Sequence, residues 1–341
     1  MDLSLFDFHL PEHLIAQHPP TRRQDSRLLI YDRATKQIQD KYFSDIVSYL
    51  NPTDVLIRNN TKVIPARLYG EKVDTKAHVE LILLDDLSKG VYRCLVGNAK
   101  VVKVGTSLRF GDGRLTATCI GIEDEGLRLI QFHFQGVFLE VLESLGEIPL
   151  PPYIKEHLTD KDRYQTVYAK VPGSAAAPTA GFHFTTELFQ TLQERGIAIE
   201  DITLQIGLGT FKPVKVDRTE DHVMHVERYT IEDDVAQRLN SYQQENRRLI
   251  AIGTTSCRTL EANRQHHDEF KGESSQTNLF ITPGYTFRAI DALITNFHLP
   301  KSTLVMLVSS LIGREEMQRV YAHAIAQSYR FFSFGDAMFI I

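Results

Sequence analysis

The sequence has few cysteines, no tryptophan and no long apolar run. Its three cysteines, Cys94, Cys119 and Cys257, are dispersed and form no CxxC pair, which argues against a disulfide framework and a zinc site. The strongest apolar run, residues 304–312, is too short for a bilayer, which needs about 20 residues. Residues 1–7 include two acids and no basic stretch, unlike a signal peptide. We therefore expect a reduced, cytoplasmic protein.

An excess of basic residues is also absent. The sequence has 38 Lys and Arg residues against 43 Asp and Glu residues, which gives a net charge of −5. This balance excludes a globally basic nucleic-acid binder but leaves room for a local basic patch. An apolar fraction of 43% excludes disorder as the main state, and 341 residues indicate about two domains.

The sequence shows two patterns, which occupy different segments of the chain. Residues 59–152 contain short β-rich runs separated by turn residues, which is typical of an antiparallel barrel or sandwich. Residues 1–58 and 153–341 alternate strand and helix patterns, including predicted strands at 279–281 and 330–341. The simplest architecture is an α/β domain built from both chain ends, with an inserted antiparallel β-barrel domain.

Residues 252–261 read as a strand, a small-residue turn and the start of a helix. Thr254, Thr255 and Ser256 would place hydroxyls and backbone N–H groups at a helix N-terminus, where anions bind. Arg258 can add a bidentate grip on a carboxylate or phosphate. The alternative is an ordinary helix cap, and the Gly-Lys-Ser/Thr end of a Walker A loop is missing.

A second small-residue turn contains Gly207, Gly209 and Thr210 after a predicted strand. Two glycines let a backbone approach a flat ligand closely, although a β-bulge gives the same pattern. The last glycine of a dinucleotide fingerprint is absent, so a Rossmann cofactor site is not expected here.

Three histidines, His183, His225 and His298, lie in predicted loops or at strand ends. A loop histidine near a carboxylate is an acid/base candidate near neutral pH, and Glu227 follows His225 by two residues. The alternative for each is a structural or merely exposed histidine. His222 and His225 have HxxH spacing but no third ligand follows, so no metal site is expected.

Ten stretches, taken in order, resemble the S-adenosylmethionine:tRNA ribosyltransferase-isomerase family of the queuosine biosynthesis pathway. They are residues 14–17, 25–29, 63–68, 149–154, 163–168, 176–181, 207–213, 253–261, 294–304 and 329–333. No single stretch is decisive, but the ordered set is specific and runs nearly end to end.

The resemblance implies a transferase with an α/β domain and an inserted barrel. Such an enzyme transfers and isomerises the ribosyl moiety of S-adenosylmethionine onto 7-aminomethyl-7-deazaguanine at the tRNA wobble position. The products are epoxyqueuosine-tRNA, adenine and methionine. S-adenosylmethionine is then a consumed substrate, so no cofactor and no metal are expected. The expected partners are S-adenosylmethionine and the modified tRNA, without a membrane, and we expect a monomer.

The candidate residues receive roles in this reaction as hypotheses. His183, His225, Glu227 and His298 are the acid/base candidates, and Glu227 is also a candidate to face the sulfonium. The turn at 207–210 would contact the nucleoside, and the turn at 254–258 would hold a carboxylate or an RNA phosphate. The predicted RNA-binding residues are Arg22, Arg27, Lys62, Arg67 and Arg330, the last within an aromatic and basic stretch that is alternatively a core strand.

The chain departs from the family pattern at Asn60, Gln205 and Arg228, where Asp, His and Trp are usual. These departures argue against a carboxylate role at residue 60 and an acid/base role at residue 205. Two other functions remain open: a sulfonium-dependent transferase that acts on a small molecule, and a non-catalytic RNA-binding protein. Turnover on free base compared with modified tRNA, and the release of adenine, distinguish them.

Overall fold

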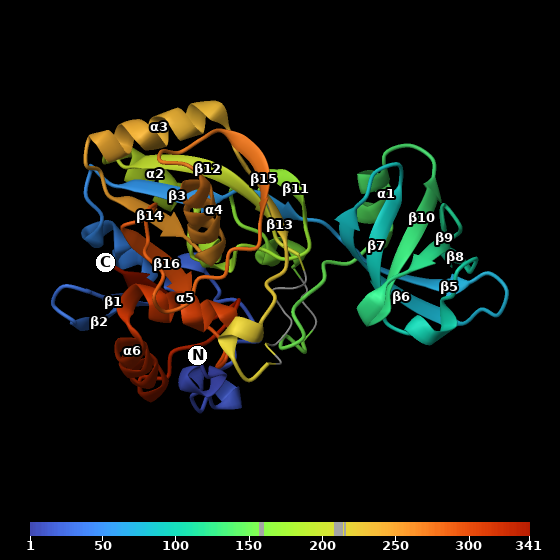
Figure 1. Ribbon diagram of the computed structural model, residues 1–341, viewed down its shortest axis with the longest axis horizontal. Helices are drawn as coiled ribbons and strands as arrows, with labels where there is room; N and C mark the ends of the chain where they lie inside the picture. Colours follow the sequence, from blue (N-terminus) through green and yellow to red (C-terminus); the bar gives the residue numbers. More distant parts are fainter. Residues whose placement is uncertain (157–159, 208–213, 215) are drawn as a thin grey trace. The chain divides into compact units, whose positions relative to one another are not determined.

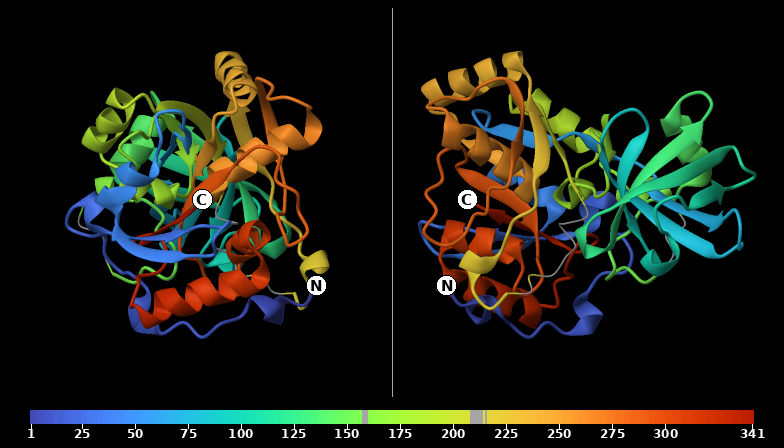
Figure 2. Two further views of the ribbon diagram at one scale, coloured as in Figure 1. Left: turned by 90° about the vertical axis from the view of Figure 1, so that its left-hand side faces the viewer. Right: turned by 45° about the vertical axis from the view of Figure 1, so that its right-hand side comes forward.

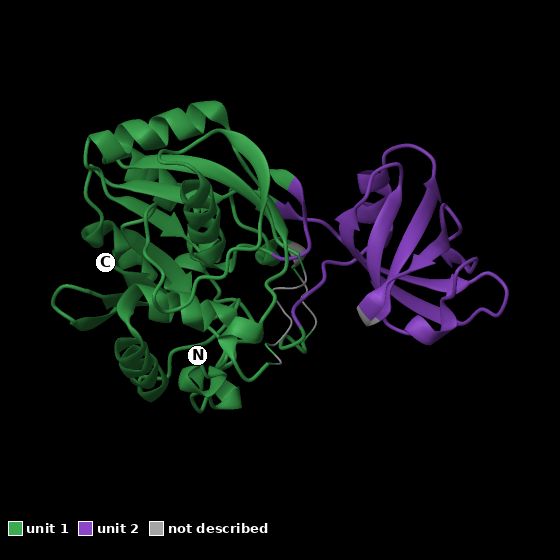
Figure 3. Cartoon of the chain, viewed as in Figure 1, with its two compact units in different colours: residues 1–61, 152–171, 177–341 green, residues 62–151, 172–176 purple. Residues whose placement is uncertain are grey.

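The chain forms two compact units (Figure 3). The computed structural model describes residues 1–156, 160–207, 214 and 216–341. The first unit contains residues 1–61, 152–171 and 177–341, and the second contains residues 62–151 and 172–176. The short segment 172–176 therefore belongs with the inserted unit, whereas the sequence-based boundaries of 59 and 152 assign it to the α/β domain.

A nine-stranded sheet forms the centre of the first unit, in the order β15-β13-β12-β3-β14-β16-β17-β1-β2 (Figure 1). In chain order its strands are β1 (Arg27–Tyr31), β2 (Ile38–Tyr42), β3 (Val55–Asn59), β12 (Ala198–Gln205), β13 (Glu227–Ile231), β14 (Leu249–Ile252), β15 (Glu273–Thr277), β16 (Ala292–Asn296) and β17 (Ala337–Ile340). Strands β12, β3, β14 and β16 run parallel to one another. The parallel neighbours β1 and β17 come from opposite ends of the chain.

Helices cover both faces of this sheet (Figure 1). They are α2 (Thr186–Glu194), α3 (Asp233–Gln244), α4 (Thr254–His266), α5 (Thr303–Ile312) and α6 (Arg314–Ala326). Helix α2 shares a hydrophobic core with alternate residues of β14, such as Ile250 and Ile252, and α4 packs on the opposite face. Every residue of β14 is buried, as expected for a parallel strand between two helical layers. Helices α5 and α6 pack against each other (Figure 2).

The second unit is a closed antiparallel barrel in the order β10-β7-β6-β5-β8-β9. Its strands are β5 (Arg67–Lys72), β6 (His78–Asp86), β7 (Val91–Val96), β8 (Ser107–Phe110), β9 (Leu115–Ile122) and β10 (Leu127–Phe134), followed by α1 (Phe138–Leu145). Alternate residues of β9 are buried in the barrel, as the period of two requires. Two short strands, β4 (Thr61–Val63) and β11 (Val171–Ser174), pair separately. The predicted fold, an α/β domain with an inserted barrel, is confirmed.

Two predicted strands are wrong in detail. Residues 279–281 are not a strand, and the edge strand β15 precedes them with the polar sequence Glu-Ser-Ser-Gln-Thr. The predicted strand at 330–341 is shortened to β17 because its first part is a tight loop. The Asp336 carboxylate accepts hydrogen bonds from the backbone N–H groups of Arg27 and Arg330, and Phe332 has a φ of 73°. Both features are incompatible with a continuous extended strand.

Cys94, Cys119 and Cys257 are buried free thiols. Among the described helices, none is both long enough and apolar enough to cross a membrane.

Candidate active site

The predicted site residues of the α/β unit gather at one edge of the sheet. The carboxyl ends of parallel strands meet at the same edge, which is where α/β sheets bind ligands. Gly207 follows β12, Thr254 follows β14 and His298 follows β16. Glu227 begins β13, which runs antiparallel to β12, so it lies at this edge as well. The topology therefore collects residues that are distant in the sequence.

Glu227 is a buried carboxylate that contacts Arg258, His225 and Gly207 among the described residues. Its side chain is 1% exposed, and Oε2 lies 2.7 Å from Nη1 of Arg258. Oε1 lies 3.1 Å from Nε2 of His225 and accepts a hydrogen bond from the backbone N–H of Gly207 at 3.3 Å. Burial raises the pKa of Glu227, but the charge of Arg258 and the contact with His225 outweigh it and hold the pKa below its usual value. Glu227 is therefore ionised at neutral pH.

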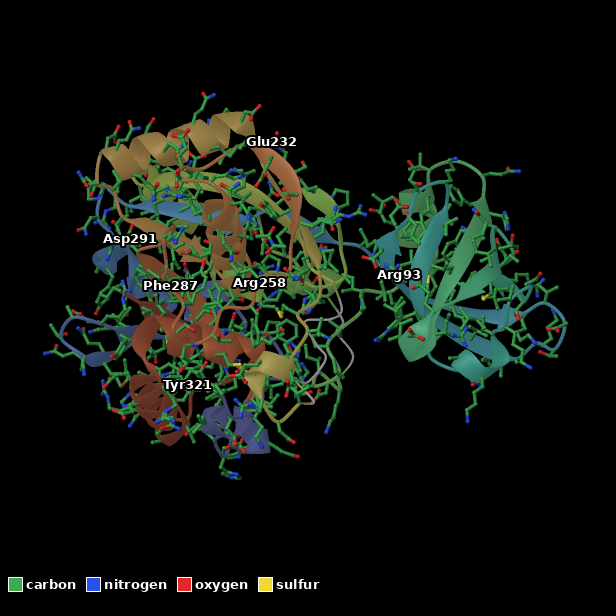
Figure 4. All side chains as sticks on the ribbon, viewed as in Figure 1. Arg93, Glu232, Arg258, Phe287, Asp291 and Tyr321 are labelled. Carbon is green, nitrogen blue, oxygen red and sulfur yellow. The ribbon has the colours of Figure 1, made fainter. Side chains whose placement is uncertain are left out.

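Arg258 is buried at the start of α4 (Figure 4). Its Nη1 binds Glu227 and its Nε donates to the carbonyl of Leu279 at 3.2 Å. Nη2 is buried and has no hydrogen-bond partner among the residues that the structure describes. Side chains on a helix lean toward its N-terminus, so this guanidinium lies over the first turn of α4. An unpaired N–H there, beside the positive end of the helix dipole, favours an anion.

The hydroxyl residues of this turn differ in what they bind. Thr255 Oγ1 is buried without a partner in the described part of the chain. Ser256 Oγ donates to the carbonyl of Ile252 at 2.8 Å, so its proton is used inside the helix. Gly253, which precedes them, has a φ of 89°, a conformation that favours glycine. The Thr255 hydroxyl is therefore buried at this turn with its hydrogen-bonding capacity unused by the described residues.

His225 is the accessible histidine of the site. Its side chain is 26% exposed, and its Nε2 contacts the Glu227 carboxylate. A histidine held by a charged carboxylate and open to solvent has the geometry of a general base.

His183 is fully enclosed and both of its ring nitrogens are occupied. It ends the 3-10 helix η8 (Thr179–His183). Nε2 accepts from the Asn296 amide at 3.1 Å and Nδ1 lies 2.7 Å from Ser26 Oγ. The Thr179 hydroxyl donates to Oδ1 of Asn296 at 3.1 Å, which turns the amide N–H toward the ring. Burial lowers the pKa of His183 to about 3, helped by the nearby charges of Arg330 and Arg23.

His298 is a second enclosed histidine. It is buried, and its Nε2 lies 2.9 Å from Thr295 Oγ1. Burial lowers its pKa to about 3. His183 and His298 are therefore neutral near pH 7 and are weak bases there.

The sequence analysis missed the three residues that hold His183, namely Ser26, Thr179 and Asn296. Each lies inside a stretch that carries the family resemblance, which was the available signal. No local spacing links them, because Ser26 is 157 residues and Asn296 is 113 residues from His183.

Gly209 and Thr210 lie outside the described residues, whereas Gly207 is described. A Cβ added to Gly207 would meet no atom of the described residues within 4 Å.

The predicted RNA-binding residues belong to two units. Arg22, Arg27 and Arg330 lie in the α/β unit, and Lys62 and Arg67 lie in the barrel unit. Most have internal partners: Arg22 pairs with its neighbour Asp25, and Arg67 with Glu80. The guanidinium of Arg27 lies 3.8 Å from the centre of the Tyr329 ring, and Arg330 lies 3.4 Å from Asp336. Lys62 is exposed.

Two departures from the family pattern meet in the structure. Gln205 and Arg228 are direct partners across β12 and β13, and both line a pocket of about 430 Å³. Because side chains alternate along a strand, Arg228 faces away from its neighbour Glu227, so this pocket is on the other face of the sheet. Asn60 Oδ1 accepts a hydrogen bond from Thr203 at 2.7 Å, which gives it a structural partner.

Within the described ranges, no group of three or more His, Cys, Asp or Glu side chains is arranged to hold a metal ion.

Two comparisons with known proteins match nearly the whole chain. The model of a family described as "Queuosine biosynthesis protein" matches residues 3–340. The crystal structure of an S-adenosylmethionine tRNA ribosyltransferase from Thermotoga maritima is 34% identical, with a TM-score of 0.57. The match covers 99% of this chain and 100% of that one.

The fold and these matches define an enzyme of the transferase class. The chain belongs to the queuosine biosynthesis protein family.

Proposed function

We propose that this enzyme transfers and isomerises the ribosyl moiety of S-adenosylmethionine onto 7-aminomethyl-7-deazaguanine at the wobble position of a tRNA. Epoxyqueuosine-tRNA, adenine and methionine are the products. The family and the name of the Thermotoga maritima relative support this assignment. S-adenosylmethionine is consumed as a substrate, so the proposal requires no resident cofactor.

The observation that carries the proposal is the charged, buried Glu227 between His225 and Arg258. The sulfonium makes the adjacent ribose carbon acidic, so the reaction needs a base close to it. His225 is the best candidate, because it is accessible and Glu227 stabilises the imidazolium that forms. The ionised Glu227 also offers a counter-charge to the sulfonium. Removal of the proton starts the elimination that expels adenine. The amine of 7-aminomethyl-7-deazaguanine then attacks a carbon of the ribosyl unit and loses a proton, and an oxygen of that unit displaces methionine and closes the epoxide.

The first turn of α4 provides an anchor for the carboxylate of the methionine moiety. Thr255 Oγ1 and Arg258 Nη2 are the donors without a partner in the described chain. Thr254 and Ser256 contribute the helix N-terminus, and the backbone N–H of Gly207 donates to Glu227 beside it. We assign the segment with Gly209 and Thr210 to nucleoside contact on its sequence alone.

His183 and His298 receive a different role from the other acid/base candidates. With a pKa of about 3, each is a weak base at neutral pH and holds its loop through hydrogen bonds. In this proposal they position the edge of the sheet and do not take the proton.

Arg22, Arg27, Lys62, Arg67 and Arg330 remain the proposed RNA contacts, with S-adenosylmethionine and the modified tRNA as partners of a monomer. Loss of a phosphate contact should flatten the dependence of log affinity on log salt by about one unit. An unchanged slope in all five variants would remove this surface from the proposal.

Parallel variants of two histidines test the assignment of the base. We expect His225→Gln to lower adenine release by at least about 100-fold with S-adenosylmethionine and precursor tRNA. His266→Gln, at the exposed end of α4, is the control and should match the wild type. If His225→Gln retains near-wild-type turnover, the assignment of His225 as the base is wrong; if His183→Gln also retains it, neither histidine is required. Turnover on the free base without tRNA would favour the small-molecule alternative.

A further inference from the structure

Arg23 and Arg163 each donate hydrogen bonds to backbone carbonyls of segments that are distant in the sequence. Arg23 donates to the carbonyls of Asp162 and Phe182 at 3.1 and 3.2 Å. Arg163 donates in return to the carbonyls of residues 20 and 21. Neither guanidinium has a carboxylate partner in the described part of the chain. Both guanidiniums are thus held by backbone carbonyls, and the nearby charges of Asp160 and Asp162 raise the pKa of Arg23 without forming an ion pair with it.

Several other arginines of the α/β unit pair with a carboxylate, whereas Arg247 and Arg264 have no carboxylate partner among the described residues. The pairs are Arg58–Asp201, Arg238–Glu200, Arg248–Asp54 and Arg258–Glu227. Arg128 in the barrel shows that carbonyls suffice when Nε, Nη1 and Nη2 are all bonded. Arg163 differs from Arg128 because its Nε is buried with no partner among the described residues. An unsatisfied N–H on a cation calls for an anionic acceptor.

The charges of the two guanidiniums lower the pKa values of nearby groups. Burial lowers the pKa of Arg23, and the positive charge of Arg163 lowers it further. The charges of Arg330 and Arg23 likewise help to lower the pKa of His183. Of these three arginines, Arg330 has a carboxylate, Asp336, at 3.4 Å. The charges of Asp160 and Asp162 act in the opposite direction and raise the pKa of Arg23.

Arg23 and Arg163 line a small pocket together with His183, Ser333 and Phe334. Its free volume is about 10 Å³, which is the room that one water molecule needs. A whole ligand does not fit inside it. One oxygen of an anion can enter, while the remaining atoms stay at the mouth between the guanidiniums.

We propose that Arg23 and Arg163 form a binding site for one backbone phosphate of the RNA substrate. This inference rests on the proposed function. A phosphodiester has a non-bridging oxygen for the pocket and a second one for the other guanidinium, which matches the paired geometry. The phosphodiester is bound at a fixed place next to the catalytic groups. Its binding adds affinity for the RNA but does not distinguish one base from another.

The position of the site relative to α4 fits a nucleotide. The 3-10 helix η8 connects the two places: Ala180 packs beside Gly253 at the start of α4, and His183 lines the arginine pocket. Three residues of 3-10 helix rise by about 6 Å. A nucleotide whose sugar reaches the first turn of α4 can therefore leave its phosphate at the arginine pair.

The test measures the affinity of precursor tRNA at several salt concentrations. Arg23→Gln and Arg163→Gln remove one positive charge each. Arg163→Lys keeps the charge but loses the two guanidinium hydrogen bonds to the carbonyls of residues 20 and 21. Arg247→Gln is the matched control, because Arg247 also bonds two backbone carbonyls without a carboxylate partner. We expect each of Arg23→Gln and Arg163→Gln to weaken binding roughly tenfold and to flatten the salt slope by about one unit. Arg163→Lys and Arg247→Gln should keep the wild-type slope.

Several outcomes overturn the site. They are an unchanged slope in folded Arg23→Gln and Arg163→Gln proteins, an equal loss in Arg247→Gln, and a flattened slope in Arg163→Lys. Affinity for S-adenosylmethionine alone should not change; a tenfold loss there would assign the pair to the substrate carboxylate instead. Wild-type protein that binds no precursor tRNA refutes the proposed function itself, which separates the two failures.

Discussion

The two buried histidines should make the α/β unit sensitive to mild acid. His183 and His298 have a pKa of about 3 in the folded protein, compared with 6.5 for an exposed histidine. Between these values the unfolded chain binds more protons than the folded one. Stability from these rings is therefore complete above pH 6.5 and declines as the pH falls toward 3.

The size of the effect follows from the shift. At pH 5 an unfolded histidine with its usual pKa gains about 2 kcal/mol from protonation, and the buried ring gains almost nothing. Each ring should therefore account for a loss of about 2 kcal/mol in the free energy of unfolding between pH 7.5 and pH 5.

Urea unfolding followed by far-UV circular dichroism measures this loss in the wild type, His183→Gln and His298→Gln. Each substitution also removes packing, but that cost is the same at both pH values and cancels in the difference. We expect each variant to lose about 2 kcal/mol less than the wild type on acidification. His266→Gln, on the exposed end of α4, should lose as much as the wild type. An equal loss in all four proteins would show that the rings are not buried and neutral as described.

Two further predictions concern single residues of the site. Gly181→Ala should destabilise the fold by about 2 kcal/mol or more, because its Cβ would overlap the hydroxyl of Tyr168. Gly207→Ala, whose Cβ would meet no described atom within 4 Å, should leave thermal stability unchanged, and equal melting temperatures of the two variants would contradict the packing. Glu227→Gln should lower the free energy of unfolding in urea by about 3 kcal/mol, because it leaves the buried charge of Arg258 without its carboxylate partner. A free energy of unfolding equal to that of the wild type would mean that the pair is solvated.

The parts of the site that are local in the sequence were predictable. The strand, the turn and the helix start at 252–261 are β14, Gly253 and α4, because a buried apolar run followed by glycine and hydroxyl residues determines that structure by itself. The edge strand β15 could not be predicted because its sequence, Glu-Ser-Ser-Gln-Thr, has no apolar residue, whereas the apolar residues 279–281 resemble a strand but do not form one.

Contacts that depend on tertiary packing could not be predicted from the spacing of residues in the sequence. Arg258 and Glu227 are 31 residues apart, and nothing local indicates that they pair. His183 reads as a loop histidine, but its burial depends on Ser26 and Asn296 from opposite ends of the chain. The sequence therefore identified the residue types of the site without showing which histidine remains accessible.

The most direct test of the central claim is the release of adenine and methionine from S-adenosylmethionine in the presence of precursor tRNA. We expect the wild-type enzyme to release both in equal amounts as the tRNA gains the mass of the ribosyl product, and Glu227→Gln to release little of either. Folded wild-type protein that releases no adenine, or that yields a methylated tRNA instead, would contradict the account.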